Sequence, residues 1–166
     1  GYIDAKYKEY ITNVTIGGVA TPTDVAAFRK VQNTPKWTAS VTPSYTAQLA
    51  NGGRIDASAT WSYRSKTYQF EIPNPFIDQK GYSLFDANLT YRAPDARWSI
   101  GLHGKNLLDK QYKTSGYTFM AVDARTGALL RNAVTNNLIP SLGTEGTLTT
   151  FYGNPRQVFL TGSIKF

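Results

Sequence analysis

The side chains with most scope for chemistry in this chain are Arg64, Asp86 and the single histidine, His103. Asp86 and His103 fall on the polar faces of two predicted neighbouring strands joined by a tight turn over residues 93–96, and we expect them to lie opposite each other. Arg64 ends the preceding predicted strand and is expected close to Asp86. The three would form a ladder, which could hydrogen-bond a polar ligand or form a salt bridge in the wall beside a neutral histidine.

Enzyme chemistry finds little support in the residue patterns. The sequence has no cysteine, no Gly-x-Ser-x-Gly and no His-Glu-x-x-His, and Gly104-Lys105-Asn106 lacks the other residues of a phosphate loop. Asp56 and Asp86 are expected near opposite ends of neighbouring strands, too far apart to share a proton or flank a bond. The sequence therefore predicts a protein that is not an enzyme, without catalytic residues, metal ligands or a cofactor.

The elements that position these side chains are strands, because apolar and polar residues alternate with a period of two. Between Trp37 and Leu49 the odd positions are apolar and the even positions polar, and the pattern returns from Ile55 to Tyr63. A three-residue loop containing Gly52 is expected to join these two strands and to pair Leu49 with Ile55 and Gln48 with Asp56. About six strands are predicted, over residues 2–11, 37–49, 55–64, 85–92, 97–105 and 157–166, and only residues 24–29 could form a helical turn.

The connections between these strands alternate in length. Those after Leu49 and Arg92 are tight, whereas those after Ile11, Lys66 and Tyr112 run to roughly 25, 15 and 40 residues. Strands of about ten residues joined by alternating short and long connections are typical of an outer-membrane barrel. A soluble β-sandwich that binds a ligand is the alternative, although its loops are more often comparable in length.

Aromatic residues cluster near the strand ends of the apolar face, whose centre is rich in Ala and Gly. Trp37, Trp61 and Tyr63 lie towards the long connections, and Tyr91, Trp98 and Phe166 lie towards the tight turns. This distribution resembles two aromatic girdles around a lipid-facing band. It favours the membrane barrel over the soluble sandwich.

The charge distribution and the hydropathy of the chain limit the kinds of partner that we expect. The chain has 166 residues, 17% of them charged, and a net charge of +7. Its basic residues are scattered singly, with Arg29-Lys30 the one adjacent pair, whereas a nucleic-acid groove usually gathers them on one face. We therefore expect no nucleic-acid partner. No apolar run is long enough to predict a transmembrane helix.

Two segments resemble a known family. Gly104 to Tyr112, with the sequence GKNLLDKQY, and Tyr152 to Phe166, with the sequence YGNPRQVFLTGSIKF, are similar to the C-terminal part of TonB-dependent outer-membrane receptors. The opening Thr34-Pro35-Lys36-Trp37 also resembles the family. The Asn and Asp side chains of the first segment are expected to bond to nearby backbone where a strand leaves the membrane.

The resemblance implies an all-β fold, an antiparallel transmembrane β-barrel segment. Residues 1–166 would be about six C-terminal strands of a 22-stranded barrel, with the plug and the earlier strands outside this chain. The function implied is uptake of a scarce nutrient, most often a ferric siderophore, across the bacterial outer membrane with energy from TonB. The implied partners are the rest of the barrel and the plug, TonB acting through the plug, the barrel-assembly machinery, and lipopolysaccharide or other lipid.

Physical reasoning agrees that six strands are not a whole barrel. Single-chain bacterial barrels have eight or more strands, and the two edges of an open sheet would leave unpaired backbone groups in lipid. The strand near residues 2–11 and the strand at residues 157–166 should therefore not pair with each other, and each should pair with a strand outside this chain.

The carboxyl terminus is the last feature that the resemblance explains. Phe166 ends the chain, and Ile164, Leu160 and Val158 precede it on the same face. By resemblance these four residues form the signal that the barrel-assembly machinery recognises. Anchoring of Phe166 at the membrane interface is the alternative, and both roles can hold together.

Overall fold

The computed structural model describes residues 1–142 and 146–166, which contain ten β-strands and one short 3-10 turn. The strands are β1 (Ile11–Ile16), β2 (Val19–Asp24), β3 (Thr38–Val41), β4 (Ser44–Gln48), β5 (Arg54–Arg64), β6 (Tyr82–Arg92), β7 (Trp98–Lys105), β8 (Lys113–Thr118), β9 (Leu148–Tyr152) and β10 (Gln157–Ile164), and the turn η1 covers Ala26–Phe28. The all-β fold predicted from the alternating pattern is confirmed, and η1 lies within the one segment where a helical turn was expected.

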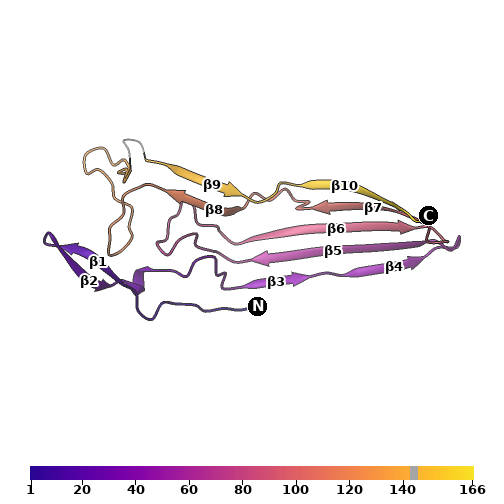
Figure 1. The fold of residues 1–166 in the computed structure, drawn as a ribbon, viewed down its shortest axis with the longest axis horizontal. Coiled ribbons are helices and arrows are strands. Elements are labelled where there is room, and N and C mark those ends of the chain that lie inside the picture. Colours follow the sequence, from indigo (N-terminus) through magenta and orange to yellow (C-terminus); the bar gives the residue numbers. More distant parts are fainter. Residues whose placement is uncertain (143–145) are drawn as a thin grey trace.

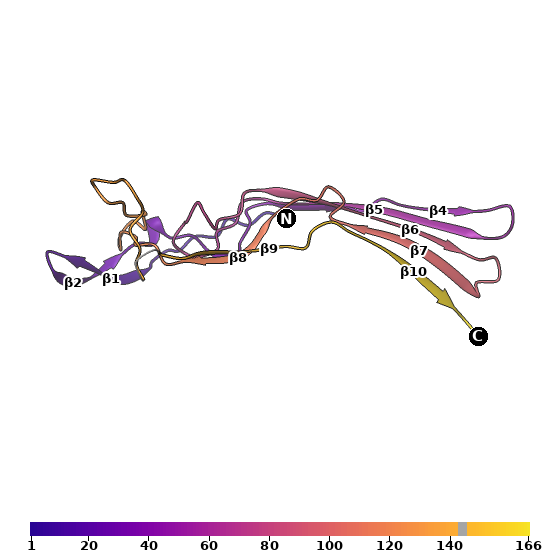
Figure 2. The ribbon, with the colours of Figure 1, turned by 90° about the horizontal axis from the view of Figure 1, so that it is seen from above.

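The main sheet is antiparallel, with β10, β7, β6 and β5 in this order and β3 and β4 both along the far side of β5 (Figure 1). β3 and β4 keep one register against β5, because Thr38 pairs with Arg64 and Ser44 with Ser58. β3 and β4 therefore form one strand of the sheet that is interrupted at Pro43, because proline has no N–H to donate. Figure 2 shows this sheet from its side as a single curved layer.

The first tight turn confirms the predicted loop but not the predicted pairing. Gly52 has φ 82°, its N–H donates to the Leu49 carbonyl at 2.9 Å, and the Leu49 N–H donates to the Gly53 carbonyl at 2.7 Å. Residues 50–52 therefore form a three-residue loop with a glycine in the left-handed region. Ile55 lies opposite Ala47, and Asp56 opposite Thr46, so the predicted partners Leu49 and Gln48 are wrong by two residues.

The second tight turn also departs from the predicted pairing by two residues, in this case through a longer loop. His103 lies opposite Asn88 and not Asp86. The predicted pairing needs a two-residue turn whose first position has φ above zero, but that position is Pro94, whose ring holds φ near −65°. The chain uses the longer loop 94–97 instead, with Ala96 at φ 55° and the Ala93 N–H donating to the Trp98 carbonyl at 3.0 Å.

The predicted strand over residues 2–11 is wrong for most of its length. Residues 1–3 pair with residues 36–38, through a bridge between Tyr2 and Trp37 and a 3.0 Å bond from the Ile3 N–H to the Lys36 carbonyl. The next residue of the partner, Pro35, has no N–H for a ladder. The pairing ends there, and Ile11 begins β1 of a separate hairpin with β2.

All three long connections lie at one end of the main sheet, which we call the loop end, and both tight turns lie at the other, the turn end (Figure 1). The loops carry strands that the sequence analysis missed. β1 and β2 form one hairpin, and β8 and β9 form another beyond the ends of β7 and β10. The alternation of short and long connections is therefore confirmed.

The main sheet has no apolar core of the soluble kind. Among the described residues, the buried apolar side chains are Val14, Val25, Ile77 and Ala93, none of which lies within a strand of the main sheet. The apolar face of that sheet is exposed at Val41, Tyr45, Leu89, Ile100, Leu102, Val158, Leu160 and Ile164. A sandwich would bury this face against a second sheet, so the structure does not support the soluble alternative.

Within the described residues, no helix has the length and apolar character needed to cross a membrane.

Candidate functional site

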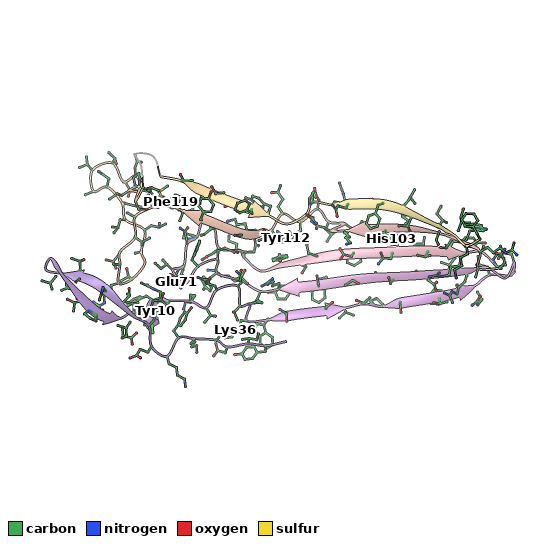
Figure 3. All side chains as sticks on the ribbon, in the orientation of Figure 1. Tyr10, Lys36, Glu71, His103, Tyr112 and Phe119 are labelled. Carbon is green, nitrogen blue, oxygen red and sulfur yellow. The ribbon has the colours of Figure 1, made fainter. Side chains whose placement is uncertain are left out.

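The polar face of the main sheet carries a hydrogen-bonded row centred on His103 of β7, a residue that is labelled in Figure 3. Its Nδ1 lies 2.9 Å from Oδ1 of Asn88, and its Nε2 lies 2.9 Å from Oγ1 of Thr161. The Asn88 amide in turn donates to Oγ of Ser58 at 3.3 Å, and the imidazole stacks on Phe159 with ring centroids 5.1 Å apart. Both imidazole nitrogens thus have partners in the wall, which supports a structural role for His103.

The predicted ladder of Arg64, Asp86 and His103 does not form. The three residues have separate partners on the neighbouring strand, namely Tyr82 for Arg64, Thr60 for Asp86 and Asn88 for His103. Arg64 is four residues along β5 from the residue opposite Asp86, which is about 13 Å at 3.3 Å per residue. The register shift at Pro94 separates His103 from Asp86. A ligand role for any of the three remains a prediction.

Arg64 instead forms a cluster with Tyr82 and Tyr112 at the loop end of the polar face, which we call the mouth cluster. The two tyrosine rings stack with centroids 4.6 Å apart and planes 15° apart. Arg64 donates from Nη2 to the Asn33 carbonyl at 2.9 Å, while its Nε is buried without a hydrogen-bond partner. This cluster needs the correct register of β5 and β6, so residue spacing alone could not find it.

A cavity of about 150 Å³ opens between the mouth cluster and the neighbouring loops. Its wall also includes Lys113 and the polar side chains of Asn33, Thr67, Gln69 and Thr114. None of the described residues that line it carries a carboxylate. Two cations, two phenols and one unsatisfied guanidinium N–H suit an anionic ligand rich in oxygen.

Asn106 fixes the chain where it leaves β7. Its side chain is buried, and its backbone lies in the left-handed region with φ 47°. The backbone N–H donates to Oδ1 of Asp86 at 2.8 Å, and the amide donates to the carbonyls of Lys110 and Asn154, each at 3.0 Å. Its Oδ1 accepts from the Lys110 N–H at 2.9 Å. The predicted bonding of this segment to nearby backbone is confirmed.

The two segments that carry the family resemblance contact each other directly. Asp109 has φ 50°, and its Oδ1 accepts from the Arg156 N–H at 2.9 Å. The Gly153 N–H donates to the Tyr112 carbonyl at 2.9 Å. Together with Asn106, these contacts connect the exit from β7 to the entry into β10 and hold Tyr112 in the mouth cluster.

The aromatic residues predicted as girdles form pairs at both ends of the apolar face. The ring centroids are 4.5 Å apart for Tyr2 and Trp37, 6.3 Å for Trp61 and Tyr63, and 5.3 Å for Tyr91 and Trp98. Tyr91 lies opposite Ile55, and the Trp37 N–H donates to Oγ of Ser65. The ten steps along the chain from Ile55 to Ser65 span about 33 Å, or about 25 Å across a membrane at 40° tilt, which is the height of a barrel's apolar band.

The four residues predicted as an assembly signal lie at one edge of the sheet. Val158, Leu160 and Ile164 are exposed on the apolar face of β10, opposite residues 104, 102 and 98 of β7. Phe166 follows β10 and is fully exposed. Recognition of these residues by the assembly machinery remains a prediction.

A charge cluster at the turn end was missed in the sequence. Arg54 lies directly opposite Arg92. Oδ2 of Asp56 lies 3.1 Å from Nη2 of Arg54 and 3.2 Å from Nε of Arg92, and its Oδ1 accepts from Oγ1 of Thr46 at 2.9 Å. Two guanidinium groups thus share one carboxylate, an arrangement that only the register of three strands reveals.

In the part of the chain that the structure describes, no group of three or more His, Cys, Asp or Glu side chains is placed to hold a metal ion.

Comparisons with known proteins agree with this geometry. Residues 1–107 match the family model described as TonB-dependent receptor-like β-barrel. The ferric-pyoverdine M114 receptor PbuA of Pseudomonas sp. (strain M114) is 28% identical over 115 residues, which cover 69% of this chain. The matched part of this chain covers about 10% of the length of that receptor. No solved structure matches the chain. The chain, a segment of an outer-membrane β-barrel, belongs to the TonB-dependent receptor family.

Proposed function

We propose that residues 1–166 form the last strands of the wall of an outer-membrane transporter that takes up a ferric siderophore with energy from TonB. In this proposal the earlier strands and the plug, which receives the TonB contact, lie outside this segment. The barrel-assembly machinery inserts the wall, and lipopolysaccharide and other lipids surround it. The family is one of transporters and receptors and not of enzymes.

The mouth cluster is the observation that carries the choice of substrate. It lies at the loop end of the polar face, which is the extracellular end of the lumen in a barrel with short periplasmic turns. Its cavity is lined by Arg64, Lys113 and two tyrosines, and ferric siderophores present many oxygen atoms and often a negative charge. A relative named as a ferric-pyoverdine receptor supports the same class of substrate.

Binding to the purified full-length receptor tests the substrate, with ferric pyoverdine as the probe and ferric citrate as a second chelate. Charge-assisted hydrogen bonds contribute about 1.5 to 3 kcal/mol, so Arg64→Gln should weaken binding about 10-fold to 100-fold. Arg131→Gln is the matched control, because Arg131 also donates to an asparagine carbonyl, that of Asn136, in an extracellular loop. Equal affinities for the two variants would contradict the role of the mouth cluster.

Energy coupling needs a separate measurement in cells. Radioactive iron supplied as the chelate should accumulate only in cells with intact TonB, whereas binding at the cell surface should persist without it. Accumulation that is unchanged in cells lacking TonB would contradict active transport and leave only passive diffusion through the barrel.

A further inference from the structure

At the turn end of the polar face, each of β5, β6, β7 and β10 has a cation at its terminal residue or at the residue next to it. We call Arg54, Arg92, Arg97 and Lys165 the basic rim. Arg54 lies opposite Arg92, and the Lys165 N–H donates to the Arg97 carbonyl at 2.7 Å, so the rim crosses from β5 to the end of β10. These residues are up to 111 positions apart in the sequence and meet only through the sheet register.

Acidic side chains of the wall neutralise only half of the basic rim. Asp56 contacts both Arg54 and Arg92, and Asp95 lies 3.7 Å from Arg97. Four cations therefore share two carboxylates. Like charges that face each other across a strand pair are unfavourable, and a concave wall of one charge attracts groups of the opposite charge.

A pocket of about 70 Å³ lies within the basic rim. It is lined by the three cations Arg92, Arg97 and Lys165 and by two serines, Ser99 and Ser163, which lie opposite each other. None of the described residues that line it has a carboxylate. Its volume is several times the roughly 10 to 15 Å³ that a cavity needs to admit one water molecule, so a single carboxylate group can enter it and contact the cations and hydroxyls.

The pocket faces the lumen, because Arg92, Ser99 and Ser163 share one row of the polar face. Lipid acyl chains contact the opposite face. We propose that the basic rim binds an acidic side chain on the domain that fills the barrel, at the periplasmic mouth. This inference rests on the proposed function, since it needs a filled lumen, but it concerns retention of that domain and not recognition of the substrate.

Carbodiimide cross-linking of the full-length receptor in outer membranes tests the contact. The reagent joins the ammonium of Lys165 to a carboxylate that touches it, and mass spectrometry of the digest identifies the partner. We expect Lys165 to be joined to an Asp or Glu of the lumen-filling domain. The exposed Lys110 in the connection after β7 serves as the control and should not be joined to that domain. Cross-links from Lys165 only to Asp95 or to a separate periplasmic protein would overturn the proposal.

Charge reversal provides a second readout. In the variant with Arg97→Glu and Lys165→Glu, proteolysis of the lumen-filling domain from the periplasmic side should be at least 10-fold faster, while Lys110→Glu should leave it unchanged. Heat-modifiable migration in gels reports whether the barrel of each variant has folded. If the double variant does not fold, the cross-link formed by Lys165 in the natural receptor is the test of the proposal. Unchanged proteolysis in a folded double variant would overturn the proposal, whatever the siderophore affinity at the mouth cluster.

Discussion

The ring of Tyr112 lies so close to Gly153 that a Cβ atom at position 153 would be 1.9 Å from Cζ of the tyrosine. The same ring stacks on Tyr82. A glycine at 153 therefore allows the segment before β10 to pass close to the mouth cluster. This contact explains why a glycine precedes Asn154-Pro155-Arg156 in the segment that resembles the family.

Gly153→Ala should displace Tyr112 or the backbone beside it. Overpacking of this kind costs about 1 to 3 kcal/mol, to be measured as the free energy of unfolding in detergent micelles with urea. Gly162→Ala is the matched control, because a Cβ atom at 162 would meet nothing within 4 Å. Equal unfolding free energies for the two variants would contradict the close packing of Tyr112 on Gly153.

The orientation of the wall predicts unequal effects of arginine on its two faces. Ala59, Leu89, Leu102 and Leu160 lie on the apolar face, where arginine near the midplane should cost about 2 to 4 kcal/mol. Ala59→Arg and Ser58→Arg change neighbouring residues of β5 that point to opposite faces. Folding equilibria in bilayers should show the large loss for Ala59→Arg only. Similar losses for both would mean that the faces are assigned wrongly.

The alternating pattern predicts the strands well but cannot fix their register. A shift of two residues keeps every side chain on its face, so the pattern is equally satisfied by Asn88 or Asp86 opposite His103. The choice is made by the turns, through Pro94 in one and the left-handed Gly52 in the other. The mouth cluster and the basic rim depend on this register, which is why single-residue candidates such as Arg64 were found and their partners were not.

The loop strands were missed for a different reason. β1, β2, β8 and β9 lie beyond the membrane band, where neither face needs to be uniformly apolar, so alternation is weak. The buried Val25 and Ile77 belong to short apolar runs, Val25–Phe28 and Phe76–Ile77, which are too short to show a period. Their packing depends on contacts between loops that are distant in the chain.

Deletion of Phe166 should lower the amount of folded barrel in the outer membrane. The residue lies beyond β10 and has no buried contacts to lose, so its loss would act through recognition during assembly and not through the stability of the sheet. Deletion of Val134, which is exposed in the long connection after β7, is the comparison. Heat-modifiable migration measures the folded fraction, and equal fractions for the two deletions would contradict the assembly signal.

The extracellular loop between β5 and β6 should become more ordered as the pH falls. Burial raises the pKa of the Asp78 carboxyl above its ordinary range, although backbone hydrogen bonds at Asn74 and Gln69 and the charges of Lys66 and Lys113 act in the opposite direction. Between the unfolded and the folded pKa the folded loop binds more protons, so its stability decreases as the pH rises through this window.

Hydrogen exchange of residues 67–79, corrected for the intrinsic effect of pH, measures this change. Exchange should slow between neutral pH and pH 4 in the natural protein. Asp78→Asn keeps an oxygen that can accept from Gln69 and removes the charge, so the slowing should be absent in this variant. The same pH dependence in both proteins would assign the effect to another group.

The free edge of β10 predicts a partner strand outside residues 1–166. The described strands form an open sheet, in which β10 pairs with β7 alone, as expected for a segment too short to close a barrel. In lipid each unpaired backbone N–H or C=O costs several kcal/mol, so the second edge of β10 must be paired in the membrane. In the full-length receptor we expect slow hydrogen exchange at every amide of Gln157–Ile164, as slow as in β6, which is paired on both sides. Fast exchange at alternate residues of β10, with β6 protected, would show that this edge stays free and that the barrel does not close there.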